Sequence, residues 1–75
     1  MNSQKERRSP VVERLIVDLE HRIQQHVFPV HSMLPSIRAL AAEYAASPRT
    51  VESALRRMCQ RGRLIRILRR RYQVR

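Results

Sequence analysis

The sequence predicts a mainly α-helical domain with a small β-hairpin, in the arrangement of a three-helix winged helix-turn-helix. Three successive segments carry apolar residues at the spacing of one buried helical face. Ser9-Pro10 and Ser47-Pro48 each combine a helix N-cap with a proline at the first helical position. Gly62 then precedes two short apolar runs that flank a basic turn, as expected for a hairpin.

The first helix is expected over residues 10–26. It follows a polar, unpatterned arm at residues 1–8, which we expect to be flexible, and residues 9–75 would form the folded domain. Residues 27–35 include two prolines that do not fit a helix interior, so this segment is predicted to be a connector. The apolar face of the first helix consists of Val12, Leu15, Ile16, Leu19 and Ile23.

The second and third helices form the predicted helix-turn-helix. The second is capped by Ser36 and covers residues 36–44, and the third starts at Ser47 and runs to Arg61. Gly62 stands where a left-handed residue commonly ends a helix. Strands are predicted at about 63–68 and 71–75. In this motif the later helix can lie in the DNA major groove.

The net charge of +10 is concentrated in the second half of the chain. Residues 1–46 carry six Lys or Arg and five Asp or Glu, whereas residues 47–75 carry ten Arg and a single acid, Glu52. Such a patch attracts polyanions, and guanidinium groups bind phosphates and guanine edges in a fork geometry. The charge therefore predicts a nucleic-acid partner.

Other classes of site are not supported by the sequence. A single cysteine, Cys59, provides neither an internal disulfide nor a zinc site. His21, His26 and His31 are five residues apart, not the four that place two metal ligands on one helical face. No Gly-rich phosphate loop is present, and no apolar run approaches the roughly 20 residues that cross a bilayer. We expect no enzyme activity, cofactor, metal or membrane partner, and a cytoplasmic location.

Two segments resemble a known family. Residues 34–41, LPSIRALA, resemble the L-P-S-x-R-x-L-A segment that enters helix 2 in the DNA-binding domain of the GntR family of bacterial regulators. Residues 47–55, SPRTVESAL, are similar to the family's S-x-x-T-V-x-x-A-L recognition helix. The resemblance covers residues 12–74. It implies sequence-specific binding of double-stranded DNA, with recognition helix 47–61 in the major groove and the wing in the minor groove.

The chain departs from the family pattern at several positions. Glycines that the family has before helix 2 and in the interhelical turn are replaced by His26, His31 and Ala45. The wing carries Arg69–Arg71 instead of two glycines around an arginine, and Glu52 stands where arginine is frequent. Family members also have a C-terminal domain that binds a metabolite and dimerises. This sequence is therefore either a stand-alone DNA-binding unit or part of a longer regulator.

Contacts with DNA are expected from the two helix starts and the wing. Arg49, in the first turn of the third helix, is the candidate for reading guanine through O6 and N7. Arg38 is expected to reach a phosphate or a base, and Arg56 and Arg57 to reach the DNA backbone. The wing arginines would meet the negative potential of a narrow minor groove. The predicted DNA-binding residues are Ser36, Arg38, Ser47, Arg49, Thr50, Ser53, Arg56, Arg57, Arg69, Arg70 and Arg71.

The leading functional hypothesis is transcriptional control, with repression by occupation of a promoter. The alternative is a mobile-element accessory protein, such as an excision, replication or conjugation factor that shapes DNA. RNA binding is disfavoured because single-stranded RNA readers use stacking aromatics and only Tyr72 lies in the basic segment. A membrane-surface helix is disfavoured because the polar face of the first helix has mixed charge. A homodimer or several copies on repeated sites are expected, because one module buries little DNA surface.

Overall fold

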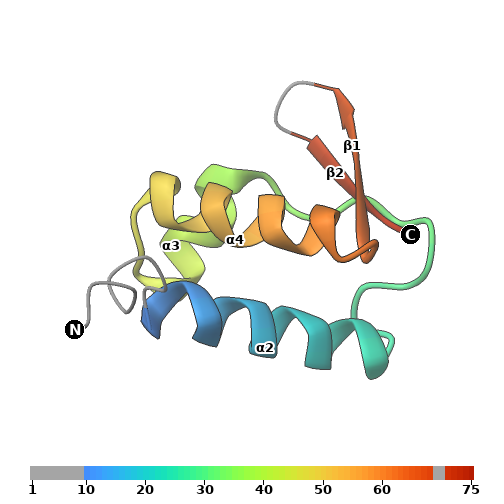
Figure 1. The fold of residues 1–75 in the computed structure, drawn as a ribbon, viewed down its shortest axis with the longest axis horizontal. Coiled ribbons are helices and arrows are strands. Elements are labelled where there is room, and N and C mark those ends of the chain that lie inside the picture. Colours follow the sequence, from blue (N-terminus) through green and yellow to red (C-terminus); the bar gives the residue numbers. More distant parts are fainter. Residues whose placement is uncertain (1–9, 69–70) are drawn as a thin grey trace.

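The computed structural model describes residues 10–68 and 71–75, and within them it confirms the predicted winged helix-turn-helix. The helices are α2 (Pro10–Gln24), α3 (Ile37–Tyr44) and α4 (Pro48–Gln60), and the strands are β1 (Leu64–Leu68) and β2 (Arg71–Val74) (Figure 1). The expected arm at residues 1–8, the Ser9 cap, and the wing positions Arg69 and Arg70 lie outside the described residues.

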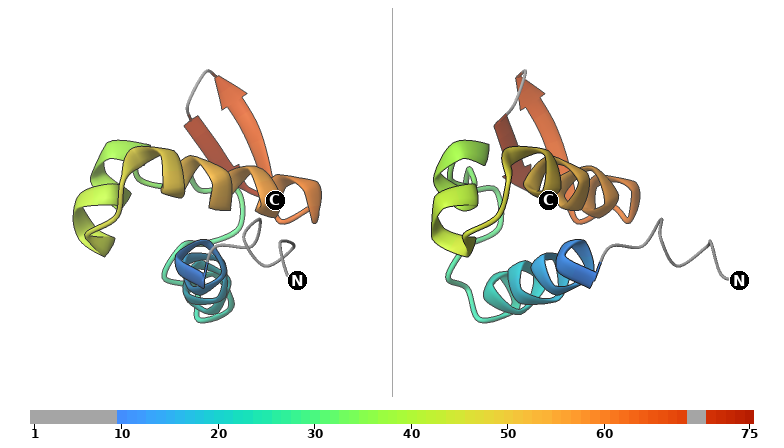
Figure 2. Two further views of the ribbon diagram at one scale, coloured as in Figure 1. Left: turned by 60° about the vertical axis from the view of Figure 1, so that its left-hand side comes forward. Right: turned by 90° about the vertical axis from the view of Figure 1, so that its left-hand side faces the viewer.

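Helix α4 is the centre of the domain. It packs against α2 on one side, α3 at its N-terminal end and β1 at its C-terminal end. Figure 1 shows α2 below α4 and the hairpin above it, and Figure 2 shows α2 nearly end-on beneath α4. Helix α4 is therefore held from three directions.

The core consists of the apolar stripes that the sequence pattern predicts. The α4 side chains Val51, Ala54, Leu55 and Met58 are each 0% exposed. Around them lie the buried apolar residues of α2, α3, the connector and the wing. These residues are Val12, Leu15, Ile16, Leu19, Leu34, Ile37, Leu40, Ala41, Leu64, Tyr72 and Val74. The burial of Tyr72 makes an aromatic from the wing part of the core.

Each described helix ends in a left-handed residue that closes a Schellman motif. These residues are His26 (φ 62°), Ala45 (φ 53°) and Gly62 (φ 77°). In each motif the next N–H donates to a carbonyl five residues back. The bonds are Val27 to Arg22 (2.8 Å), Ala46 to Ala41 (2.9 Å) and Arg63 to Met58 (2.9 Å). Helix α2 accordingly stops at Gln24, slightly before the expected residue 26.

Three positions where this chain lacks the glycines of the GntR pattern have a left-handed backbone. His26, His31 and Ala45 all have positive φ, and His31 has φ 70°. Each of these residues carries a Cβ, which makes a left-handed backbone unfavourable by about 1–2 kcal/mol per residue. This chain therefore makes three left-handed turns at residues other than glycine.

The base of the wing is tied to the connector that leads into α3. Strands β1 and β2 are antiparallel, and a register irregularity lies between Arg66 and Leu68. The N–H of Leu34 donates to the Tyr72 carbonyl at 2.9 Å, and the N–H of Val74 donates to the Ser32 carbonyl at 2.9 Å. Strand β2 thus lies between β1 and the connector. This pairing fixes the wing relative to the start of α3.

Candidate nucleic-acid interface

The N-terminus of α4 is built by Ser47 and Pro48. The Ser47 Oγ accepts a hydrogen bond from the Thr50 N–H at 3.1 Å, and the Ser47 and Thr50 hydroxyls are 2.9 Å apart. Pro48 occupies the start of the helix, where its missing N–H costs no intrahelical bond. The cap fixes the first turn, so the side chain of Arg49 leaves α4 from a defined position and is exposed.

A polar stripe runs along α4 opposite its buried face. With 3.6 residues per turn, Arg49, Ser53, Arg56 and Gln60 share this stripe. Arg49, Arg56 and Gln60 are exposed and Ser53 is half-buried. Three of these residues were predicted from the sequence. Gln60 was not predicted, although it follows Ser53 by seven residues, a spacing that places both on the same face of a helix.

The starts of α3 and α4 meet the wing at a shallow hollow of about 310 Å³. Its described lining residues are Ser36, Ile37, Arg38, Pro48 and Arg71, which include no acidic side chain. The Ser36 Oγ caps α3 by accepting the Ala39 N–H at 3.0 Å. Helix N-termini carry free N–H groups and partial positive charge. The hollow therefore combines two helix starts with two arginines, which suits an anion such as a DNA phosphate.

Carboxylates of α2 neutralise a separate group of arginines. Arg57 Nη1 donates to Glu13 Oε2 at 2.9 Å. Glu20 Oε2 lies 3.9 Å from Arg61 Nη1 and 3.7 Å from Arg63 Nε. These arginines are held on the α2 side of α4. Arg57, one of the predicted DNA-binding residues, is thus engaged with α2 and lies off the Arg49–Arg56 stripe.

The arginines at the two helix starts, on the α4 stripe and in the wing differ from this group because carboxylates do not neutralise them. Arg38, Arg49, Arg56 and Arg71 form no ion pair with any carboxylate within residues 10–68 and 71–75. The positive charge of the domain is therefore divided. Its α2 side is largely compensated, and its helix-start side keeps an excess that a polyanion can neutralise.

The side of α4 next to the wing carries mixed charge near Tyr72. Burial raises the pKa of the Tyr72 hydroxyl; Arg66 and Arg56 oppose this rise and Glu52 adds to it. Burial also raises the pKa of the Cys59 thiol, again against Arg66. Arg66 thus lies beside α4. It was missed from the sequence because a lone arginine inside an apolar strand gives no sign of which helix it faces.

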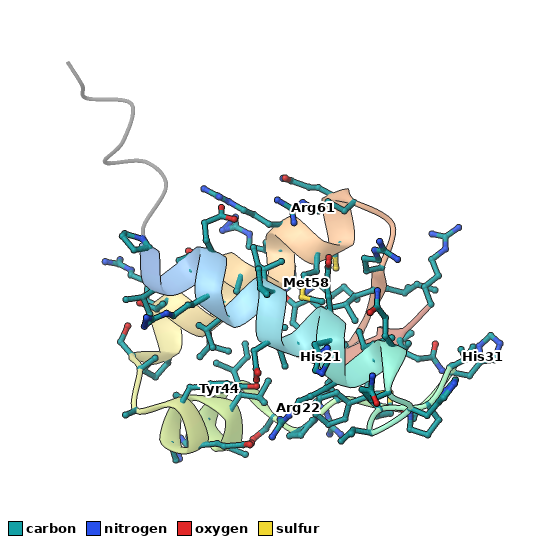
Figure 3. The ribbon with its side chains drawn as sticks, turned by 90° about the horizontal axis from the view of Figure 1, so that it is seen from below. His21, Arg22, His31, Tyr44, Met58 and Arg61 are labelled. Atoms are coloured by element: carbon teal, nitrogen blue, oxygen red, sulfur yellow. The ribbon has the colours of Figure 1, made fainter. Side chains whose placement is uncertain are left out.

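Arg22 joins α2 to α3 in a polar cluster. It donates a hydrogen bond to Glu43, which raises its pKa, and its guanidinium carbon lies 5.3 Å from the Phe28 ring centroid and 5.6 Å from that of Tyr44. The Tyr44 hydroxyl donates to Asp18. Figure 3 shows Arg22 and Tyr44 together on the α3 side of α2. This cluster sets the position of α3, and with it the position of Arg38.

The described part of the chain gives no support for three other kinds of site. No group of three or more His, Cys, Asp or Glu residues there has the geometry to hold a metal ion. No helix of residues 10–68 is long and apolar enough to cross a membrane. The described aromatic rings, Phe28, Tyr44 and Tyr72, are all at least half-buried. They present no open stacking platform for single-stranded bases.

The fold and the uncompensated arginines define a DNA-binding domain of the winged helix-turn-helix class. The chain matches the family model described as bacterial regulatory proteins, gntR family, over residues 11–74. It therefore belongs to the GntR family, whose domain binds double-stranded DNA in transcription regulators and is not an enzyme fold. A comparison with curated proteins found no match.

Proposed function

We propose that this protein is a sequence-specific transcriptional repressor that inserts α4 into the major groove and the wing into the minor groove. The observation that carries the proposal is the surface where the exposed stripe of α4 meets the hollow at the helix starts. Its arginines Arg38, Arg49, Arg56 and Arg71 have no carboxylate partner in the described chain. Bound at a promoter, the domain would exclude other proteins from the same DNA.

The residues of this surface are assigned different tasks. Arg49 reads guanine, because it is exposed in the first turn of α4 and a guanidinium matches O6 and N7. Ser53 follows one turn later and contacts the same or the neighbouring base pair. The Ser47 and Thr50 hydroxyls already bond each other, so we assign them to the helix start and to phosphate. Arg56 binds the DNA backbone.

The hollow is proposed to hold a phosphate. Ser36 and Arg38 approach it from α3, and Arg71 approaches from the wing. Phosphate contacts of this kind fix the register of a protein on the duplex, and base contacts then supply the sequence preference. The predicted roles of Arg69 and Arg70 in the minor groove remain part of the proposal. Arg57 is assigned to the α2–α4 contact through Glu13.

Selection of bound duplexes from a random pool tests this function. The protein should enrich one sequence, and a gel-shift assay should show binding to that duplex in excess competitor DNA. Arg38→Ala and Arg49→Ala should weaken binding. Arg61→Ala is the matched control, because Arg61 lies on the compensated α2 side, 3.9 Å from Glu20. Equal binding to every duplex would contradict sequence-specific repression.

A second function, as a DNA-shaping accessory protein of a mobile element, is favoured by one observation. Leu68 and Ile67, the last two residues of β1, are 67% and 45% exposed. Apolar side chains beside minor-groove arginines can wedge between base steps and kink the duplex. Circularly permuted fragments carrying the selected site would distinguish the two functions. Strong bending that Leu68→Ala abolishes supports the shaping role, and unbent DNA supports repression.

A further inference from the structure

One acidic side chain stands within the basic surface of α4. Glu52 is the single acid of residues 47–75, and it lies three residues after Arg49 and four residues before Arg56. Residues at these separations are neighbours on the surface of a helix. The Glu52 side chain is half-buried. A carboxylate at this place is repelled by the same polyanion that attracts the arginines, so it lowers affinity for DNA unless a donor on the DNA pairs with it.

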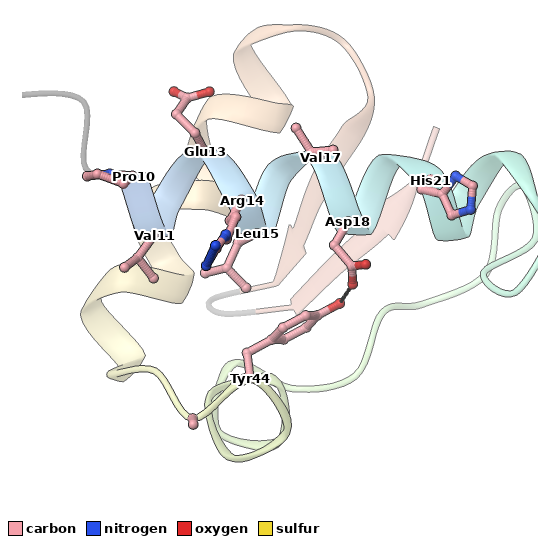
Figure 4. Close-up of a pocket in the computed structure, with 10 residues that line it drawn as sticks. Pro10, Val11, Glu13, Arg14, Leu15, Val17, Asp18, His21 and Tyr44 are labelled. Atoms are coloured by element: carbon pink, nitrogen blue, oxygen red, sulfur yellow. Dashed lines mark hydrogen bonds between the residues drawn. The ribbon is translucent and has the colours of Figure 1, made fainter.

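Glu52 differs from the carboxylates of α2 and α3, which all form ion pairs or hydrogen bonds. Their partners are Arg57 for Glu13, the Tyr44 hydroxyl for Asp18 (Figure 4), Arg61 and Arg63 for Glu20, and Arg22 for Glu43. Glu52 has no ion-pair partner within residues 10–68 and 71–75. Arg56, four residues later, is the natural partner on the same helix, but the two form no ion pair. The Glu52 carboxylate is therefore available to a ligand.

Glu52 lies on the flank of α4 that borders the wing. Burial raises the pKa of the Tyr72 hydroxyl in β2, Arg66 opposes this rise and Glu52 adds to it. Arg66 of β1 is paired with Tyr72 across the hairpin, so Glu52 is near the base of the wing. Arg57 is on the other flank of α4, where it contacts α2. The exposed stripe of α4 thus has guanidinium donors along its middle and a carboxylate acceptor at its wing edge.

We propose that Glu52 selects cytosine by accepting a hydrogen bond from its N4 amino group in the major groove. The inference rests on the proposed insertion of α4 into that groove. Cytosine presents a donor and no acceptor at its major-groove edge, whereas thymine and guanine present acceptors that a carboxylate repels. Adenine presents a donor at N6 but an acceptor at N7 beside it. Among the four bases, cytosine is therefore the one that suits an acceptor-only side chain.

The spacing of Glu52 and Arg49 determines which base pairs they reach. Three residues advance about 4.5 Å along a helix. This is comparable to the distance of about 3.4 Å between stacked bases of one strand. Glu52 therefore reads a base pair next to the guanine assigned to Arg49, and the selected duplex should carry guanine and cytosine in neighbouring base pairs.

Single-base-pair variants of the selected duplex test this assignment. Wild type should bind the duplex with cytosine at this position about tenfold more tightly than the duplex with thymine there. Glu52→Gln and Glu52→Ala should both lose most of this preference, because neither variant has a carboxylate. Both should also bind the thymine duplex more tightly than wild type does, since no carboxylate then faces the thymine O4. Fluorescence anisotropy titrations measure these affinities, and the guanine preference due to Arg49 should persist in both variants.

A matched control separates base selection from general effects of charge and folding. Glu20→Gln also removes one carboxylate, but on the α2 side of α4, and should leave the cytosine preference unchanged. Circular dichroism confirms that each variant is helical. If Glu52 only stabilised the fold, its variants would bind the cytosine and thymine duplexes more weakly by the same factor, and this result would overturn the proposal.

The same titrations distinguish a failure of this inference from a failure of the proposed function. A guanine preference that depends on Arg49, without a cytosine preference that depends on Glu52, would overturn the inference and leave the proposed function standing. A wild-type protein without preference at any base pair would overturn both.

Discussion

The turn between α3 and α4 provides a quantitative test, because Ala45 occupies a left-handed conformation that glycine would adopt more easily. Its φ and ψ are 53° and 44°. A Cβ in this region costs about 1–2 kcal/mol. Glycine removes this cost but makes the unfolded chain more flexible, which takes back about 0.4–1 kcal/mol. Ala45→Gly should therefore raise the free energy of unfolding by roughly 0.5–1 kcal/mol.

The same substitution three residues earlier is the matched control. Ala42 is exposed within α3, where glycine should lower the free energy of unfolding by about 0.5–1 kcal/mol. Since 1 kcal/mol shifts the Tm of a domain this size by about 4–8 °C, thermal melts followed by circular dichroism will resolve both changes. The two variants should move Tm in opposite directions. A fall in Tm for Ala45→Gly as large as that for Ala42→Gly would refute the assignment of backbone strain.

Three further predictions concern charge. Arg57→Ala should lower the free energy of unfolding by up to about 1 kcal/mol, because the half-exposed ion pair with Glu13 is lost. The same variant should weaken DNA binding less than Arg49→Ala does. Urea unfolding measures the first effect and gel shifts measure the second. Arg71→Ala should weaken binding to all duplexes similarly and reduce the slope of log affinity against log salt by about 0.9, as expected for one phosphate contact. An unchanged slope would contradict that contact. Burial and the hydrogen bond to Asp18 raise the pKa of Tyr44 above its ordinary value of about 10. The protonated Tyr44 hydroxyl therefore contributes its full stability below about pH 10, and this contribution is lost as the pH rises further. Urea unfolding at increasing pH should show this loss, and Tyr44→Phe should reduce it; an identical alkaline decline in the variant would exclude Tyr44 as a source.

The helices, core and hairpin could be predicted because their signals are local. Ser36 and Ser47 cap α3 and α4 through their own Oγ atoms, and the apolar spacing within each helix is sufficient to identify its buried face. Gly62 likewise marks the end of α4 directly, since glycine favours positive φ. At His26 and Ala45 the same turn is made without glycine. Composition alone therefore gives no sign of it there.

The candidate site was less predictable because it depends on tertiary contacts. Arg56 and Arg57 are adjacent and chemically identical in the sequence, but Arg57 meets Glu13, 44 residues away, whereas Arg56 stays on the exposed stripe. The pairing of the connector with β2 places Arg71 beside the start of α3 in the same way. Such contacts follow from how α2 and the wing pack on α4. No local pattern near the arginines encodes them.

The central claim, that the first turn of α4 reads bases, is tested most directly by comparing wild type and Arg49→Ala on the selected duplex and on a scrambled one. If Arg49 contacts a guanine, the variant should lose about 1–3 kcal/mol on the selected duplex and little on the scrambled one. Its preference at one base pair should also relax. An equal loss of affinity on both duplexes would show that Arg49 contacts only the phosphate backbone, and would contradict the account.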